Sequence, residues 1–190
     1  MTKTYVENQT FEKIDFKKNP IYQADYENCT FIRCDLSYTD LSNMHFSECE
    51  FNGCNISMAK MFSTELIDAR FIDCKLLWLN FENCSKLLCS FYFENSILDL
   101  VSFRWLKIKK TQFINSSLHE ANFTNSDLTS SVFDTCDLAW AVFEKTILEK
   151  VDFRTSYSYS IDPTKNRIKK AKFSMQEVRG LLDQYDIEIV

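Results

Sequence analysis

The sequence predicts an all-β solenoid, in which short parallel strands stack along a single axis. Large apolar residues recur every five positions along most of the 190 residues, and small residues usually stand two positions before them. An α-helix or a flat strand would instead repeat every 3.6 or 2 residues. Five residues must therefore form one side of a coil and turn a corner, and successive coils then hydrogen-bond at about 4.8 Å, as strands do.

The apolar residue of each five-residue unit, which we call the central residue, indicates how many sides a coil has. Phe11, Phe31, Phe51, Phe71 and Phe91 are each 20 residues apart, which predicts a four-sided coil with one column of phenyl rings. Later in the chain phenylalanine recurs every ten residues, which places rings on opposite sides of each coil. The phenylalanines expected to stack in the core are Phe11, Phe31, Phe51, Phe71, Phe93, Phe103, Phe113, Phe123, Phe133, Phe143 and Phe153.

The segment 82–92 interrupts the repeat and shifts its phase. Lys86 falls on a central position, where its charge would be buried, and Phe91 and Phe93 compete for the next one. A bulge or short outward loop explains the interruption as well as a functional hinge does, and the sequence leaves both open. We therefore expect one solenoid domain over residues 1–160, with a phase break at 82–92.

Residues 161–190 lack the repeat and are expected to form a connection, a short C-terminal α-helix and a tail. Pro163 indicates a turn, and Ser174 followed by Glu177 forms a capping box that predicts the start of the helix. The segment can cap the open end of the solenoid or join two chains about a two-fold axis. The apolar residues expected in a dimer interface are Met175, Val178, Leu181, Leu182, Tyr185, Ile187 and Ile189.

The composition excludes several function classes. Gly53 and Gly180 are the only glycines, so neither a phosphate-binding P-loop nor a dinucleotide-binding turn is present. We interpret this scarcity as a sign that the corners do not need a positive φ angle at every turn. No apolar run is long enough to span a membrane and no signal peptide is evident, so a cytoplasmic protein is expected. The net charge of -5 indicates no direct nucleic-acid binding.

The chemistry-bearing residues do not form a catalytic or metal-binding motif. The cysteines from Cys29 to Cys84 mostly share the small inward position, where a thiol fills space. His45 and His119 are outward and far apart, and neither has a nucleophile at a motif spacing. We expect no enzymatic activity, no cofactor, no metal site and no disulfide bond.

Three tryptophans stand two residues after a central position and are expected on the surface. Trp78, Trp105 and Trp140 are candidate contacts with a partner protein, because large exposed apolar side chains mark such surfaces. A second surface feature is a basic patch from Arg104 to Lys110.

The five-residue units resemble the pentapeptide-repeat family. The pattern of a small residue, Asp or Asn, and Leu or Phe is seen in CDLSY, TDLSN, ANFTN, SDLTS, CDLAW and VDFRT, and it covers residues 9–155. The resemblance implies a right-handed quadrilateral parallel β-helix. The order of solenoid, connection, helix and tail is similar to the quinolone-resistance (Qnr) proteins and to an immunity protein against a gyrase-poisoning microcin.

That resemblance implies a function as well as a fold. Those relatives dimerise through the C-terminal end, and their acidic rod is thought to mimic DNA and to bind DNA gyrase or topoisomerase IV. We therefore expect a homodimer that confers resistance or immunity to a gyrase poison. The alternative is a scaffold or protein–protein interaction module with an unrelated partner, which the basic patch favours.

Overall fold

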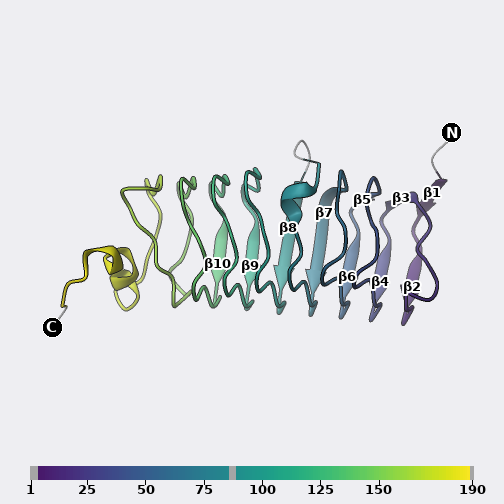
Figure 1. Cartoon of the computed structure of the whole chain (residues 1–190), viewed down its shortest axis with the longest axis horizontal. Coiled ribbons are helices and arrows are strands. Elements are labelled where there is room, and N and C mark those ends of the chain that lie inside the picture. The colour runs from purple at the N-terminus through teal and green to yellow at the C-terminus, as the bar shows by residue number, and fades with distance from the viewer. Residues whose placement is uncertain (1–3, 86–88, 189–190) are drawn as a thin grey trace.

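The chain forms a parallel β-solenoid that runs from β1 at one end to the C-terminal segment at the other (Figure 1). This computed structural model describes residues 4–85 and 89–188. The strands are β1 (Thr4–Glu7), β2 (Thr10–Glu12), β3 (Ala24–Glu27), β4 (Thr30–Ile32), β5 (His45–Ser47), β6 (Glu50–Asn52), β7 (Glu65–Ile72), β8 (Cys89–Glu94), β9 (Gln112–Ile114) and β10 (Val132–Asp134). The 3₁₀ helices are η1 (Phe81–Asn83), η2 (Val178–Leu181) and η3 (Asp183–Tyr185).

Parallel pairing between successive coils holds the solenoid together. Strand β2 pairs with β4 so that Phe11 faces Phe31, and β4 pairs with β6 so that Phe31 faces Phe51. Where a side is too short to count as a strand, isolated parallel bridges such as Asp40 to Lys60 continue the pattern. The 20-residue register therefore applies on the short sides as well as in the strands.

The core consists of stacked side chains from equivalent positions of successive coils. The ring centroids of Phe11 and Phe31 lie 4.8 Å apart with an interplanar angle of 13°, and those of Phe31 and Phe51 are also 4.8 Å apart. Phe113 stacks on Phe133 at 4.6 Å and meets Phe123, from a second column, edge to face at 6.0 Å. Rings thus stack within a column and meet the rings of a neighbouring column edge to face.

The phase break adds two residues to one coil. Phe71 pairs with Phe93, and the register shifts between Leu66 and Ala69 where β7 meets β8. The expectation that Phe91 continues the first column is therefore wrong: the ring of Phe93 stacks on Phe71 at 5.2 Å, while Phe91 lies beside Phe81 at 5.1 Å. The predicted central position of Lys86 lies outside the described residues.

The corners contradict the interpretation of the glycine content. The residue that stands two positions after a central residue has a positive φ angle in most of the described coils. Glycine occupies one of these corners, at Gly53, whereas others are occupied by residues such as Tyr38 (φ 60) and Asn125 (φ 58). Two hydrogen bonds hold the corner at Tyr38: Thr39 N donates to Leu36 O (3.2 Å), and Tyr38 N donates to Ser57 O of the next coil (3.0 Å). Glycine is scarce because the stacked coils impose this conformation on other residues.

The predicted C-terminal α-helix is also wrong, because the segment forms only η2 and η3. Ser174 Oγ accepts the Glu177 N–H at 3.2 Å, but the Glu177 carboxylate accepts from Ser158 N (3.3 Å) instead of completing the capping box. Gly180 O in turn accepts the Ile161 N–H at 2.8 Å. Contacts with the last coil therefore replace regular helical pairing. No helix among the described residues is both long and apolar enough to cross a membrane.

Truncating one stacked ring should strongly destabilise the solenoid. Phe113 is fully buried, so Phe113→Ala should lower the free energy of unfolding by about 3–5 kcal/mol through lost burial and a cavity. Phe62 is 65% exposed, and Phe62→Ala serves as the control with a loss of about 0.5 kcal/mol or less. Urea unfolding measures both; similar losses for the two variants would contradict the stacked core.

The corner conformation should be visible in a glycine–valine comparison at Lys145, which is exposed and has φ 54. Lys145→Gly should stay within about 0.5 kcal/mol of the parent, since relief of the left-handed backbone offsets the greater freedom of the unfolded chain. Lys145→Val should lose about 1–2 kcal/mol, because a β-branched side chain tolerates positive φ poorly. Equal unfolding midpoints for the two variants would show that this corner is not left-handed in solution.

Candidate functional site

The features with functional potential lie on the outside of the rod. Within residues 4–85 and 89–188, no group of three or more His, Cys, Asp or Glu side chains is placed to hold a metal ion. The described cysteines are free thiols, and burial raises the pKa of Cys49 and of Cys136 to about 12. Cys34 N donates to Cys54 Sγ at 3.4 Å, as the stacking of equivalent inward positions requires. Seven of the described thiols are buried in the core, and Cys89 is partly buried.

Carboxylates cap many corners and remain ionised there. Asp40 Oδ1 accepts the Ser42 N–H at 3.0 Å, and hydrogen bonds from Ser42 lower the pKa of Asp40 below 3.8. Hydrogen bonds from Arg154 likewise lower the pKa of Asp152 to about 2. Asparagine makes the same cap, because Asn122 Oδ1 accepts the Thr124 N–H at 2.9 Å. Part of the negative surface of the rod is therefore built from groups that also hold its corners.

One corner of the rod carries bulky apolar side chains in register, and we call it the apolar corner. Its members occupy equivalent positive-φ positions of different coils and are Tyr38, Met58, Trp78, Leu100 and Trp140; Glu120 occupies this position in the coil between Leu100 and Trp140. Tyr38 is 65% exposed, Trp78 56% and Trp140 76%. Asparagine or glycine would fit these positions with less strain, and exposed rings add no burial, so the fold alone does not explain them.

The structure separates the three tryptophans that the sequence grouped together. Trp78 and Trp140 belong to the apolar corner, whereas Trp105 lies at a different corner beneath Arg104, whose guanidinium carbon is 4.1 Å from its ring centroid. The predicted basic patch is divided in the same way. Arg104 lies near Glu82 (3.9 Å), while Lys107, Lys109 and Lys110 lie on the next side of the coil.

His119 adds a titratable group beside Trp140. The two ring centroids are 6.3 Å apart in an edge-to-face arrangement, and His119 Nε2 lies 2.8 Å from Asp137 Oδ2. The hydrogen bond with Asp137 is the main reason that the pKa of His119 lies above 6.5. Protonation of this histidine therefore changes the charge beside the exposed indole of Trp140.

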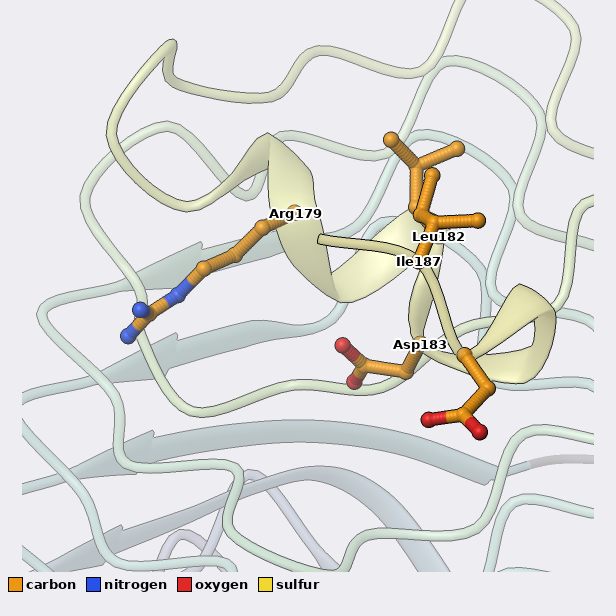
Figure 2. A pocket seen from close by; sticks show the side chains of 5 residues that line it. Arg179, Leu182, Asp183 and Ile187 are labelled. Carbon is orange, nitrogen blue, oxygen red and sulfur yellow. The ribbon is translucent and has the colours of Figure 1, made fainter. Parts of the chain in front are cut away.

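The C-terminal end closes the last coil by a close backbone approach. A Cβ atom at Gly180 would lie 2.0 Å from Tyr159 O, so only glycine permits η2 to sit this close. Beside η2 and η3 is a hollow of about 360 Å³, lined by Arg179, Leu182, Asp183, Asp186 and Ile187. In the view of Figure 2 the side chains of Leu182 and Ile187 point the same way, whereas those of Arg179 and Asp183 point in other directions.

The expected interface residues divide into two groups. Leu181 packs against the core, and Val178 and Leu182 are half-buried, so these residues cover the end of the solenoid. Met175 (85% exposed), Tyr185 and Ile187 project into solvent, and Ile189 lies outside the described residues. The segment thus caps the solenoid and still presents an apolar surface.

Sequence reasoning missed Tyr38 and Met58 as members of the apolar corner. The signal was present, because Tyr38, Met58 and Trp78 are spaced by 20 residues. It was hidden by the two added residues of the phase break, which move the next member to Leu100.

Family models match most of the repeat region. The model described as a pentapeptide repeat region matches residues 24–103, and the model described as pentapeptide repeats (8 copies) matches residues 93–134. Together they span residues 24–134 and include the phase break. None of the curated proteins compared matches the sequence.

Solved structures share the fold over the whole length. Two structures of trypsin-treated variants of QnrB1, a plasmid-mediated fluoroquinolone resistance protein, each have a TM-score of 0.62 with this chain. The first is 17% identical, with 99% of this chain and 98% of that chain covered. The second is 16% identical, with both chains covered completely. At this identity the likeness shows the fold alone.

The His119–Asp137 pair predicts a pH dependence. The His119 ring should titrate above pH 6.5, and Asp137→Asn should lower its midpoint while keeping the corner cap, as Asn122 does. Because the folded-state pKa is raised, the stabilising effect of the pair is present below pH 6.5 and is lost as the pH rises through the raised value. NMR titration of His119 measures the midpoint, with Asp162→Asn as the control; equal midpoints in all three proteins would contradict the pairing.

Proposed function

Because this chain belongs to the pentapeptide-repeat family, we propose that it acts without catalysis, as a rod-shaped protein that binds a type II topoisomerase in place of DNA. The finer geometry belongs to the same proposal: a right-handed, quadrilateral β-helix over residues 1–160, followed by a C-terminal unit over residues 161–190. The target would be DNA gyrase or topoisomerase IV in the cytoplasm, and the benefit would be resistance or immunity to a gyrase poison.

The observation that carries this proposal is the acidic surface on a fold shared with QnrB1. Residues 1–160 contain 22 acids and 16 bases, a net charge of -6, whereas residues 161–190 have a net charge of +1. Hydrogen bonds at the corners keep carboxylates such as Asp40 and Asp152 ionised at neutral pH. A rigid rod with fixed negative charges can compete with a duplex for a positively charged protein surface.

A homodimer through the C-terminal end is the second part of the proposal. Met175, Tyr185 and Ile187 leave an apolar surface beside the hollow at η2 and η3. An isologous contact between two such ends would bury this surface and place two rods end to end. The rod would then approximately double in length without any change in its acidic sides.

The apolar corner supports the alternative function, a scaffold or interaction module with an unrelated partner. The rings of Tyr38, Trp78 and Trp140 add no negative charge to a DNA-like surface. Exposed aromatic rings are instead typical of contacts with another protein. The two functions differ in which side of the rod makes the contact, so substitutions can separate them.

A supercoiling assay with purified gyrase tests the proposal. The protein at micromolar concentration should inhibit supercoiling or restore it in the presence of a fluoroquinolone or a microcin. The variant with Asp35→Asn, Asp40→Asn and Asp137→Asn should need several-fold more protein, because it loses three charges while asparagine keeps the caps. Circular dichroism should show the same fold for both proteins.

Two control variants assign the outcome. Trp78→Ala with Trp140→Ala should leave the effect on gyrase unchanged and would reduce it if the apolar corner made the contact. Tyr185→Asp with Ile187→Asp, at two exposed residues of the proposed interface, should halve the mass in light scattering. The absence of both inhibition and rescue would reject topoisomerase binding, and a parent protein that runs as a monomer would reject the dimer.

A further inference from the structure

One side of the solenoid loses its backbone pairing before the other sides do, and we call it the Val142 side. Its parallel bridges run from Asn80 to Val142, and within the described residues no bridge continues it further. The other three sides are each bridged to one more coil, by the pairs Asp137–Tyr157, Ile147–Arg167 and Asp152–Lys172. The Val142 side therefore ends one coil early.

The next coil turns away from Val142 because its backbone bonds elsewhere. Asp162 stands 20 residues after Val142, at the place of the next bridge. In the regular ladder its carbonyl oxygen would accept the Phe143 N–H, as Val142 O accepts the Phe123 N–H at 2.9 Å. Asp162 O instead accepts from Asn166 Nδ2 at 2.9 Å. Phe143 N is thus left with no hydrogen-bond partner among the described residues.

A hollow of about 440 Å³ lies where this coil turns away. It is lined by Ala141, Val142 and Phe143, by Trp140 of the apolar corner, and by residues of η3. Val142 is 41% exposed and Trp140 76%. Ala141 O, like Phe143 N, has no partner among the described residues. The volume is within the range of about 300–1,000 Å³ that is typical of binding sites.

The two unpaired backbone groups indicate an extended peptide as the occupant. Ala141 and Phe143 are buried residues, and buried N–H and C=O groups are almost always paired in proteins. One coil earlier a single residue fills the equivalent positions, since Asn122 N donates to Val101 O at 2.9 Å and Asn122 O accepts the Phe103 N–H at 2.8 Å. A peptide that adds to the edge of a sheet makes the same pair of bonds.

The charges around the hollow are mainly negative. Its described lining contains Glu144, Asp162 and Asp183 and one cation, Lys165. Lys165 Nζ lies 3.8 Å from Asp162 Oδ2, whereas Glu144 and Asp183 are exposed and form no ion pair with a described residue. Glu120 adds a further acid at the corner position one coil before Trp140. A cationic occupant would compensate these charges.

Trp140 offers a cation a second favourable contact. An indole ring attracts an ammonium or guanidinium group that lies within about 6 Å of its centroid. The chain itself contains such a pair, because the Arg104 guanidinium carbon lies 4.1 Å from the Trp105 ring centroid. The ring of Trp140 meets His119 edge to face, and no described arginine or lysine stacks on it.

The same features disfavour other classes of partner. A nucleic acid or an acidic peptide in the hollow would be repelled by Glu144 and Asp183. A purely apolar partner would bury these two carboxylates without a compensating charge, which costs free energy. Only a segment that is both extended and basic satisfies the backbone groups, the indole and the carboxylates together.

We propose that this hollow binds an extended basic segment of a partner protein. The backbone of the segment pairs with Ala141 and Phe143, and one of its arginine or lysine side chains lies between the Trp140 ring and the carboxylates of Glu144 and Asp183. The inference deepens and rests on the alternative function, that of an interaction module, and it names the chemistry of the partner. It does not rest on topoisomerase binding.

Fluorescence anisotropy of the full chain with a labelled probe peptide tests the proposal. The probe is a peptide of about eight residues that alternates arginine with threonine, because threonine favours extended backbone. It should bind with a dissociation constant below about 100 μM, and several-fold more weakly when salt is raised from about 0.1 M to about 1 M.

Two modified probes separate the contacts. A version with citrulline in place of arginine keeps the shape without the charge and should bind at least about tenfold more weakly. A version with N-methylated backbone amides keeps the charge and cannot donate to Ala141 O, so it should bind at least about fivefold more weakly.

A substitution at Trp140 tests the indole. Trp140→Asn should weaken binding of the arginine probe about tenfold. Asparagine suits the positive-φ corner, as native Asn125 shows, so the fold should persist in circular dichroism. Trp78→Asn, at an exposed position of the same corner outside the hollow, is the matched control and should bind like the parent.

A second pair of variants tests the carboxylates. Glu144→Gln with Asp183→Asn removes the two unpaired charges and should weaken binding about fivefold. Glu7→Gln with Glu48→Gln removes two exposed acids on another side of the rod and should bind like the parent. In NMR spectra the probe should shift the Trp140 indole signal and leave the Trp78 indole signal unchanged.

Several results would overturn the inference. One is no binding below about 100 μM. Another is equal binding by the parent and Trp140→Asn, and a third is an equal loss in the two charge variants, which would show general attraction to an acidic protein. A fall in the mass of the parent dimer on Trp140→Asn would assign the hollow to a second copy instead. Because the assay contains no gyrase, its failure leaves topoisomerase binding untouched.

Discussion

The structure depends on one repeated interaction, the backbone pairing of each residue with its equivalent in the next coil. This pairing brings Phe11 onto Phe31 and Asp40 next to Lys60, and it determines which side chains share a column. It also supports the corners, because the amide of a residue such as Tyr38 donates to the following coil. Core composition, corner conformation and surface charge are therefore consequences of one register.

The register could be predicted from the sequence, but its local exceptions could not. The 20-residue spacing of Phe11, Phe31, Phe51 and Phe71 indicates a 20-residue coil, because each phenylalanine fills the same interior position of its coil. The choice between Phe91 and Phe93 depends on how the chain accommodates two extra residues, which periodicity does not contain. The capping box at Ser174 was a sound local signal, but pairing of Gly180 with Ile161 and of Glu177 with Ser158 outweighed it.

The candidate surfaces were less predictable than the core. The exposure of Trp78, Trp105 and Trp140 follows from their position after a central residue, but their neighbours do not. Which residues share a corner depends on the length of every intervening coil, so the alignment of Trp78 with Leu100 across the phase break required the structure.

The close approach of Gly180 to Tyr159 also affects how the molecule comes apart. In a solenoid each coil contacts only its neighbours, so opening begins at an end and proceeds coil by coil. At the C-terminal end η2 covers the last coil and Gly180 O holds the amide of Ile161, whereas Phe11 in the first coil is only partly buried. Amide hydrogen exchange should therefore spread inward mainly from β1 and β2, so that the two ends of the rod differ in lifetime although they share one repeat.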